Sequence, residues 1–167
     1  MTVVIADTSP LNYLVLIDAI AVLPRLYVEV VTPPEVLDEL RDGDAPPKVL
    51  AWIQTRPGWL EVRKARFGQL DPALLRIDSG ERAAILRAQV ESDVLLLIDD
   101  AVGRAEASRR GIPTTGTLGV LRAAAVGQHL DLSTALSRLV ATNFRVAPSL
   151  IAELLAEDAE RRRQLDE

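Results

Sequence analysis

Acidic residues follow two apolar stretches of the chain, at the point where a buried strand would end. The run Val3-Val4-Ile5 is followed by Asp7, and the run from Val94 to Ile98 is followed by Asp99 and Asp100. Continuous apolar runs of this length are typical of strands buried on both faces of a parallel sheet. Ligands of open α/β sheets bind at the carboxyl ends of such strands. The sequence therefore predicts that these carboxylates lie together at one edge of the sheet.

Two predicted helices supply further acids. Glu39 lies about two turns into a helix expected over residues 33–41, and Glu81 lies in the first turn of a helix expected over residues 80–90. Carboxylates gathered without Lys or His repel one another and raise each other's pKa, and a divalent cation removes that cost. Ligands that are all oxygen favour Mg²⁺ or Mn²⁺, ions that activate water and neutralise phosphate oxygens.

Each acid also has a purely structural interpretation. Asp7 could stabilise its own turn, and Glu39 could be a solvated helix residue. Glu81 could favour the helix N-terminus through the helix dipole, and Asp99-Asp100 could form a turn that caps the next helix. Only the joint pattern of the five acids favours a metal site over these alternatives.

The composition excludes several other kinds of site. The chain has no cysteine, which excludes disulfides and thiolate metal sites. Its only histidine, His129, lies in a turn signal, which argues against histidine catalysis and a His-rich zinc site. The net charge of -5 gives no basic footprint for nucleic-acid binding, but a carboxylate cluster itself lowers the total, so a nuclease is not excluded.

The length and apolar content predict one globular domain. The chain has 167 residues, of which 49% are hydrophobic and 26% charged. There is no apolar run of 18 residues and no basic region followed by an apolar stretch at the N-terminus. We therefore expect no membrane association and a cytoplasmic location.

The alternation of strands and helices predicts an α/β fold. We expect a three-layer α/β/α domain with a mainly parallel sheet of four or five strands and with residues 3–5 at its centre. Ser9, Thr32 and Ser79 are expected to cap helices. The expected strands are 3–6, 28–31, 59–62, 94–98 and 112–115, and the expected helices are 10–17, 19–26, 33–41, 47–55, 80–90, 101–110, 118–126, 133–142 and 148–159.

Two segments are expected to lie outside this framework. Residues 63–71 are polar and predict a loop. Residues 158–167 are charged almost throughout and predict a solvated helix end or frayed terminus that contributes little to stability. The domain is accordingly expected over residues 1–157, with 158–167 as a charged C-terminal tail.

The acids stand in four of five short motifs whose order and spacing cover nearly the whole chain. The motifs are Ala6-Asp7-Thr8-Ser9-Pro10-Leu11, Val36-Leu37-Asp38-Glu39-Leu40, Asp78-Ser79-Gly80-Glu81-Arg82-Ala83-Ala84, Leu97-Ile98-Asp99-Asp100 with Gly103-Arg104, and Gly116-Thr117-Leu118-Gly119-Val120-Leu121. Together they resemble the PIN-domain family, in particular its single-domain VapC-type toxins and their PIN-like relatives. That family is similar in fold to the FEN-type 5′ nucleases, and the resemblance implies metal-dependent cleavage of RNA with Mg²⁺ or Mn²⁺.

The resemblance assigns roles to the acids. Asp7 matches the first acid of the family and Glu39 the second. Glu81 matches the helix acid, although many toxins of the family carry aspartate near that place. Either Asp99 or Asp100 matches the fourth acid. All five are therefore candidate catalytic residues and metal ligands.

Three further residues are candidates for supporting roles. Thr8 or Ser9 is expected to hydrogen-bond a ligand carboxylate or a metal-bound water. Arg104 lies one turn beyond the Asp99-Asp100 pair, where a salt bridge on the helix surface is the alternative.

The implied partners are an RNA substrate, an antitoxin protein and a second copy of the chain. The basic residues that could hold the RNA backbone, with solvated surface charge as the alternative for most, are Arg63, Lys64, Arg66, Arg109 and Arg110. A non-catalytic PIN-like module that binds RNA or protein is the main alternative function. A phosphatase of the haloacid-dehalogenase type is disfavoured, because it needs a second Asp where this chain has Ser9.

Overall fold

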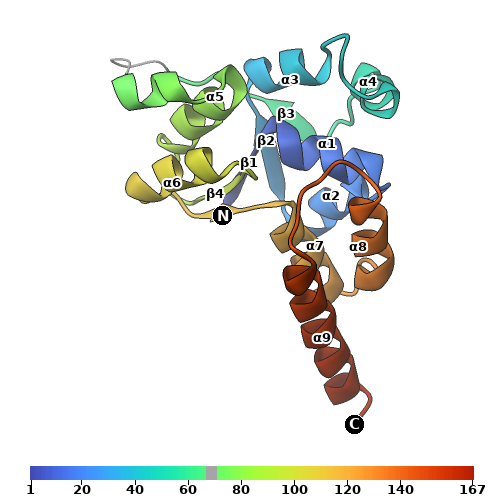
Figure 1. Cartoon of the computed structure of the whole chain (residues 1–167). Helices are drawn as coiled ribbons and strands as arrows, with labels where there is room; N and C mark the ends of the chain where they lie inside the picture. Colours follow the sequence, from blue (N-terminus) through green and yellow to red (C-terminus); the bar gives the residue numbers. More distant parts are fainter. Residues whose placement is uncertain (67–70) are drawn as a thin grey trace.

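The apolar run at the start of the chain forms the centre of a parallel sheet. In the computed structural model, which describes residues 1–66 and 71–167, strand β1 (Val3–Ala6) is buried along its whole length (Figure 1). It pairs in parallel with β2 (Glu29–Thr32) on one side and with β4 (Val94–Leu97) on the other. The edge strands are β3 (Leu60–Val62) and β5 (Thr114–Thr115), which gives the order β3-β2-β1-β4-β5. The predicted parallel sheet is confirmed.

Alternating side chains of β1 feed two separate cores, one on each face of the sheet. Val4 and Ala6 pack with the buried residues of the helices on one face, whereas Val3 and Ile5 pack with those of the other. The first face carries α1 (Thr8–Leu16), η1 (Ile20–Val22), α2 (Leu23–Leu26), α3 (Pro34–Leu40), α4 (Pro47–Gln54), α7 (Thr117–Val126) and α8 (Leu132–Val140). The second face carries η2 (Pro72–Arg76), α5 (Ser79–Ala88) and α6 (Ala101–Arg109). The predicted three-layer α/β/α architecture is therefore confirmed.

Three hydroxyl residues that were expected to cap helices have other positions. Ser9 lies inside α1, Ser79 is the first residue of α5, and Thr32 ends β2 and donates a hydrogen bond of 2.8 Å to the carbonyl oxygen of Ala6. The expectation was wrong because the chain turns directly from each preceding segment into its helix, so the helix starts earlier or the cap lies one residue away. The observed N-cap residues are Asp7, Pro33 and Asp78, and none of their side chains makes a capping hydrogen bond.

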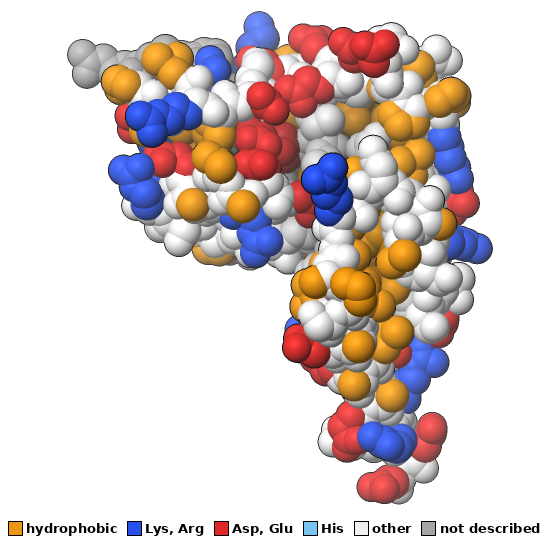
Figure 2. All heavy atoms as spheres, in the orientation of Figure 1, with side chains coloured by type: hydrophobic (Ala, Val, Ile, Leu, Met, Phe, Trp, Pro, Cys, Tyr) orange, Lys and Arg blue, Asp and Glu red, His pale blue; other side chains and the backbone are white. Residues whose placement is uncertain are grey.

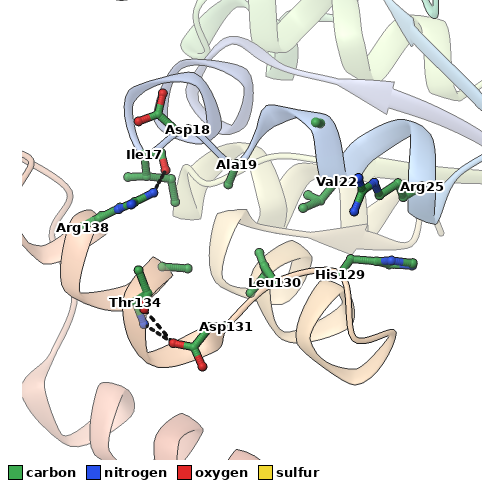
Figure 3. Close-up of a pocket in the computed structure, with 12 residues that line it drawn as sticks. Ile17, Asp18, Ala19, Val22, Arg25, His129, Leu130, Asp131, Thr134 and Arg138 are labelled. Atoms are coloured by element: carbon green, nitrogen blue, oxygen red, sulfur yellow. Dashed lines mark hydrogen bonds between the residues drawn. The ribbon is translucent and has the colours of Figure 1, made fainter.

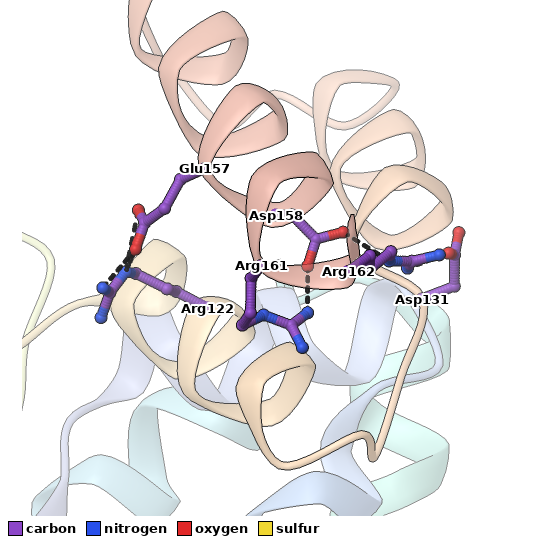
Figure 4. A network of polar contacts seen from close by, with 6 residues as sticks. All are labelled: Arg122, Asp131, Glu157, Asp158, Arg161 and Arg162. Carbon is purple, nitrogen blue, oxygen red and sulfur yellow. Dashed lines mark hydrogen bonds and ion pairs between the residues drawn. The ribbon is translucent and has the colours of Figure 1, made fainter. Parts of the chain in front are cut away.

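The C-terminal helix α9 (Pro148–Leu165) is longer than its sequence pattern indicated and extends away from the sheet (Figure 1). The expected boundary between residues 157 and 158 falls inside it. Asp158 is only 8% exposed and forms an ion pair with Arg162 Nε at 2.9 Å, while Arg162 also pairs with Asp131 at 2.7 Å (Figure 4). Most of residues 159–167 are exposed, and the ion pair of Arg162 with Asp131 links this end of α9 to the start of α8. Whether residues 158–167 contribute to stability stays a prediction.

Of the predicted loop at 63–71, residues 67–70 lie outside the described part of the chain, and 63–66 have no regular structure. No single helix of the described residues is both long and apolar enough to cross a membrane; α1 taken with the η1–α2 segment passes the same test only as a pair bent by 117°.

Candidate functional site

An acidic pocket of about 290 Å³ opens at the carboxyl end of β1. Figure 2 shows acidic side chains gathered on this face of the molecule, between α3, α5 and α6. The pocket brings together three of the predicted site acids with residues of the first turns of α1. Its lining consists of Asp7, Thr8, Ser9, Asn12, Tyr13, Glu39, Asp78 and Glu81.

Asp7 is the most deeply placed acid of the pocket. It directly follows β1, is only 3% exposed, and its Oδ1 atom is buried with no hydrogen-bond partner among the described residues. Burial, together with the negative charges of Glu81, Glu39 and Asp99, raises the pKa of Asp7 to about 8, although a backbone hydrogen bond from Thr8 acts in the opposite direction. An ionised carboxylate here therefore needs a positive partner, and none of the residues that line the pocket is a Lys or Arg.

Glu39 comes from the last turn of α3 and is held by two donors. The hydroxyl group of Thr8 donates to one carboxylate oxygen, and the backbone N–H of Gly80 donates to the other at 2.8 Å. A Cβ atom at position 80 would lie 2.6 Å from both oxygens. Only glycine allows this close approach, so the start of α5 is shaped around the Glu39 carboxylate.

Glu81 faces the same pocket from the first turn of α5. Its pKa is raised to about 7, first by partial burial and then by the negative charges of Asp100, Asp78 and Glu39. At neutral pH the side chain therefore exists in both protonation states, as an acid–base catalyst requires.

Asp99 and Asp100 have distinct surroundings and do not line the pocket. Asp99 accepts hydrogen bonds from the backbone N–H and the hydroxyl group of Thr117, both at 2.7 Å, and from the Ser9 hydroxyl group at 2.9 Å. Asp100 caps α6 by accepting from the N–H of Gly103 at 3.0 Å. Asp99 thus joins the ends of β4, α1 and α7, while Asp100 acts on the pocket through its charge on Glu81.

The two hydroxyl candidates of α1 each donate a hydrogen bond to an acidic side chain. Thr8 bonds the Glu39 carboxylate and Ser9 bonds the Asp99 carboxylate. Arg104 is exposed on α6, and within residues 1–66 and 71–167 it forms no ion pair, so the surface salt bridge weighed for it is absent there.

The basic residues proposed for RNA contact fall into two groups. Arg63 pairs with Glu29 and Glu61, and Arg109 and Arg110 both pair with Glu106; the Arg110 pair measures 2.7 Å. Lys64 and Arg66 are exposed. The paired arginines therefore fasten the protein's own elements together.

The donor set fits a hard divalent cation. It consists of carboxylate and hydroxyl oxygens, and Asp7 Oδ1 is an unpartnered buried ligand atom. In the part of the chain that is described, no three acidic or histidine side chains are close enough to hold an ion directly, so the five predicted ligands do not form one ready-made shell. Mg²⁺ normally keeps several waters and takes only one or two carboxylates from a protein, which is what Asp7 and Glu81 offer.

Four residues of the site were missed from the sequence. Asn12 and Tyr13 lie one helical turn after Ser9, so their i+3 and i+4 spacing places them on the same face of α1 and could have revealed them. Asp78 precedes α5 and adds to the acidic lining. Thr117 lies far along the chain from Asp99, and no local pattern indicates their contact.

A second cavity, of about 320 Å³, lies between α1, η1, α2 and α8 (Figure 3). Its acids are fully engaged: Asp18 pairs with Lys48 at 2.6 Å, and Asp131 accepts from the N–H of Thr134 at 2.9 Å. Hydrogen bonds from Thr134 and Arg162 lower the pKa of Asp131 to about 2. The two cavities thus differ in chemistry, because only the pocket at β1 holds acids with raised pKa values.

Comparisons with known proteins agree with this geometry. No curated protein matches the sequence. A family model described as a PIN domain matches residues 3–160, which include every acid discussed above. PIN domains have a nuclease-type fold, are generally nucleases and typically use divalent metal ions. The sheet, the pocket and the match over nearly the whole chain lead to one conclusion: this chain belongs to the PIN-domain family.

Proposed function

We propose that the protein is an endoribonuclease that hydrolyses RNA phosphodiester bonds with Mg²⁺ or Mn²⁺. The observation that carries this proposal is the state of Asp7. Its carboxyl group is buried beside Glu39 and Glu81, has an unpartnered oxygen, and has a pKa of about 8. Such a group gives up its proton readily only in exchange for a cation.

The side chains of the pocket divide the work of hydrolysis. A divalent ion, when bound, supplies charge that neutralises phosphate oxygens and lowers the pKa of water. Asp7 and Glu81 are the residues that would hold it. Glu39 and Asp99, whose oxygens accept bonds from Thr8 and Ser9, keep the first turn of α1 in place and maintain the negative potential of the pocket.

Glu81 is also suited to proton transfer. With a pKa of about 7 it can accept a proton from the attacking water or return one to the leaving oxygen near neutral pH. The same side chain therefore serves either as a ligand or as a general base, and replacing it removes both functions.

Cleavage of a mixed single-stranded RNA in Mn²⁺ tests the proposal. Asp7→Asn should lower the cleavage rate by about 100-fold or more and abolish stabilisation by Mn²⁺. Asp18→Asn is the matched control, because Asp18 is an exposed acid that lines the other cavity, and it should cleave like the wild type. A wild-type protein that neither cuts RNA nor gains stability from Mn²⁺ would instead support a non-catalytic binding module.

We also propose that the protein is the toxin of a toxin–antitoxin pair and forms a homodimer. The resemblance of the chain to VapC-type toxins supports this proposal. So do the exposed apolar side chains of Val126, Leu150 and Leu165 on α7 and α9, the region where Figure 2 shows orange side chains.

Expression of the wild type, but not of Asp7→Asn, should arrest growth of a bacterial host. Light scattering should give a mass twice that of the 18.2 kDa chain.

A further inference from the structure

The loop between α8 and α9 is fastened to the rim of the acidic pocket. Tyr13, which lines the pocket, donates a hydrogen bond of 2.8 Å from its hydroxyl group to Asn143 Oδ1. Its ring meets the ring of Phe144 edge to face, with centroids 4.9 Å apart and an interplanar angle of 82°. Within the loop, the N–H of Phe144 donates to the Thr142 hydroxyl oxygen at 3.2 Å. These contacts fix the position of the loop beside α1, as its path in Figure 1 shows.

Arg145 directly follows the two anchored residues. It is the only basic residue between Ala141 and Ala147, it is exposed, and among the described residues it has no ion-pair partner. Consecutive Cα atoms are about 3.8 Å apart, so its side chain starts within one residue of the Tyr13–Phe144 contact.

The pocket needs a cation from outside its own lining. Its lining residues include four acids and no Lys or Arg, and the whole chain carries a net charge of -5. An RNA strand that reaches this pocket brings several negatively charged phosphates. A metal ion at Asp7 would neutralise the charge of only the nearest one. Arg63 and Arg110 are committed to ion pairs elsewhere, whereas Arg145 is not.

We infer that Arg145 binds a backbone phosphate of the RNA next to the one held at the acidic pocket, and that Tyr13 positions Arg145 by anchoring the loop. This inference rests on the proposed function, because it assigns the substrate contact of the same site. The planar guanidinium group suits a phosphate, to which it can donate two parallel hydrogen bonds. The contact is made to the backbone, so it favours no base sequence.

Binding of a fluorescein-labelled, mixed single-stranded RNA in EDTA, followed by anisotropy between 50 and 200 mM salt, tests the role of Arg145. Arg145→Gln should raise the Kd about 5-fold and make the slope of log K against log salt shallower by about 0.7, the value for one phosphate contact on a single strand. Arg25→Gln is the matched control, because Arg25 is exposed and lines the other cavity, and it should change neither quantity. Stabilisation by Mn²⁺ should be the same in all three proteins.

A double-mutant cycle tests the positioning role of Tyr13. Tyr13→Phe keeps the ring contact with Phe144 but removes the hydroxyl donor to Asn143. If Tyr13 acts through Arg145, the substitution should weaken RNA binding in the wild-type background and have no added effect in Arg145→Gln. Additive effects of the two substitutions would overturn this part of the inference.

The outcomes separate the inference from the proposal on which it rests. Wild-type protein that binds RNA with the same Kd and salt slope as Arg145→Gln would overturn the role of Arg145 and leave the nuclease proposal standing. Wild-type protein that neither binds nor cleaves RNA would overturn the proposed function itself.

Discussion

The raised pKa values of Asp7 and Glu81 link the site to the stability of the fold. Burial raises the pKa of Asp7 from 3.8 to about 8 and that of Glu81 from 4.5 to about 7. Between the unfolded and folded pKa values the folded chain binds more protons than the unfolded chain, so its stability falls as the pH rises. Acids with lowered pKa values, such as Asp131, are already ionised in both states above pH 5 and do not alter this slope.

We therefore expect the melting temperature in EDTA to fall between pH 5 and pH 8. A decrease in the free energy of unfolding on the order of 2 kcal/mol would lower the melting temperature by about 4–8 °C for a chain of this size. Asp7→Asn removes most of this dependence, because asparagine is neutral at every pH, and it should be more stable than the wild type at pH 8. Differential scanning calorimetry at several pH values measures both effects. A wild-type melting temperature that stays constant or rises over this range would contradict the assigned pKa values.

Single residues were predicted best where a strand determines their position. Asp7 could be placed at the edge of the sheet because the apolar run before it is typical of a buried strand. The positions of the acids in α3 and α5 could be predicted from their distance along each helix. The hydrogen bonds of the acids could not be predicted in the same way. That Asp99 is held by Thr117 and Ser9, and Glu39 by Gly80, depends on how distant segments pack. The sequence therefore could not show which carboxylates accept hydrogen bonds from distant segments and which do not.

At the scale of elements, the amphipathic pattern of α9 does not predict which of its charged residues are buried. Its last two turns are charged on all sides, which is typical of a solvated end, yet Asp158 is buried and bonded by Arg161 and Arg162 (Figure 4). The sequence contains both partners at i+3 and i+4, but it does not show that α7 and α8 lie beside this turn. The same reason explains why the helix continues past the predicted end.

Asp158→Asn should destabilise the protein by about 1–2 kcal/mol, because it leaves two arginines near the α8–α9 contact without their carboxylate. Glu160→Gln provides the control, since Glu160 also pairs with an arginine at i+3 but is exposed; its effect should stay within about 0.5 kcal/mol. Urea unfolding measures both. Equal, small effects of the two substitutions would support the prediction that residues 158–167 form a tail that contributes little to stability.

At the scale of the whole molecule, the fold creates the site at a cost in stability that a cation can offset. The parallel sheet brings the ends of β1 and β4 together, and α3 and α5 add their acids to the same edge. Each element is stable for ordinary reasons of burial and packing. The repulsion arises only when they assemble, which explains why the overall architecture could be predicted from apolar patterns while the energetic state of the pocket could not.

Metal binding at Asp7 should therefore offset the part of the pH dependence of stability that Asp7 causes. An ion that binds at Asp7 must displace its proton, so below a pKa of about 8 its apparent affinity should rise up to tenfold per pH unit. The same concentration of Mn²⁺ should therefore stabilise the fold by about 2.7 kcal/mol more at pH 8 than at pH 6. In a melting experiment this difference corresponds to about 5–10 °C. Potassium chloride at equal ionic strength controls for screening of the net negative charge. Asp7→Asn should gain no stability from Mn²⁺ at either pH. If Mn²⁺ stabilised both proteins equally at both pH values, the ion would be acting at the general surface, and Asp7 would not be its ligand.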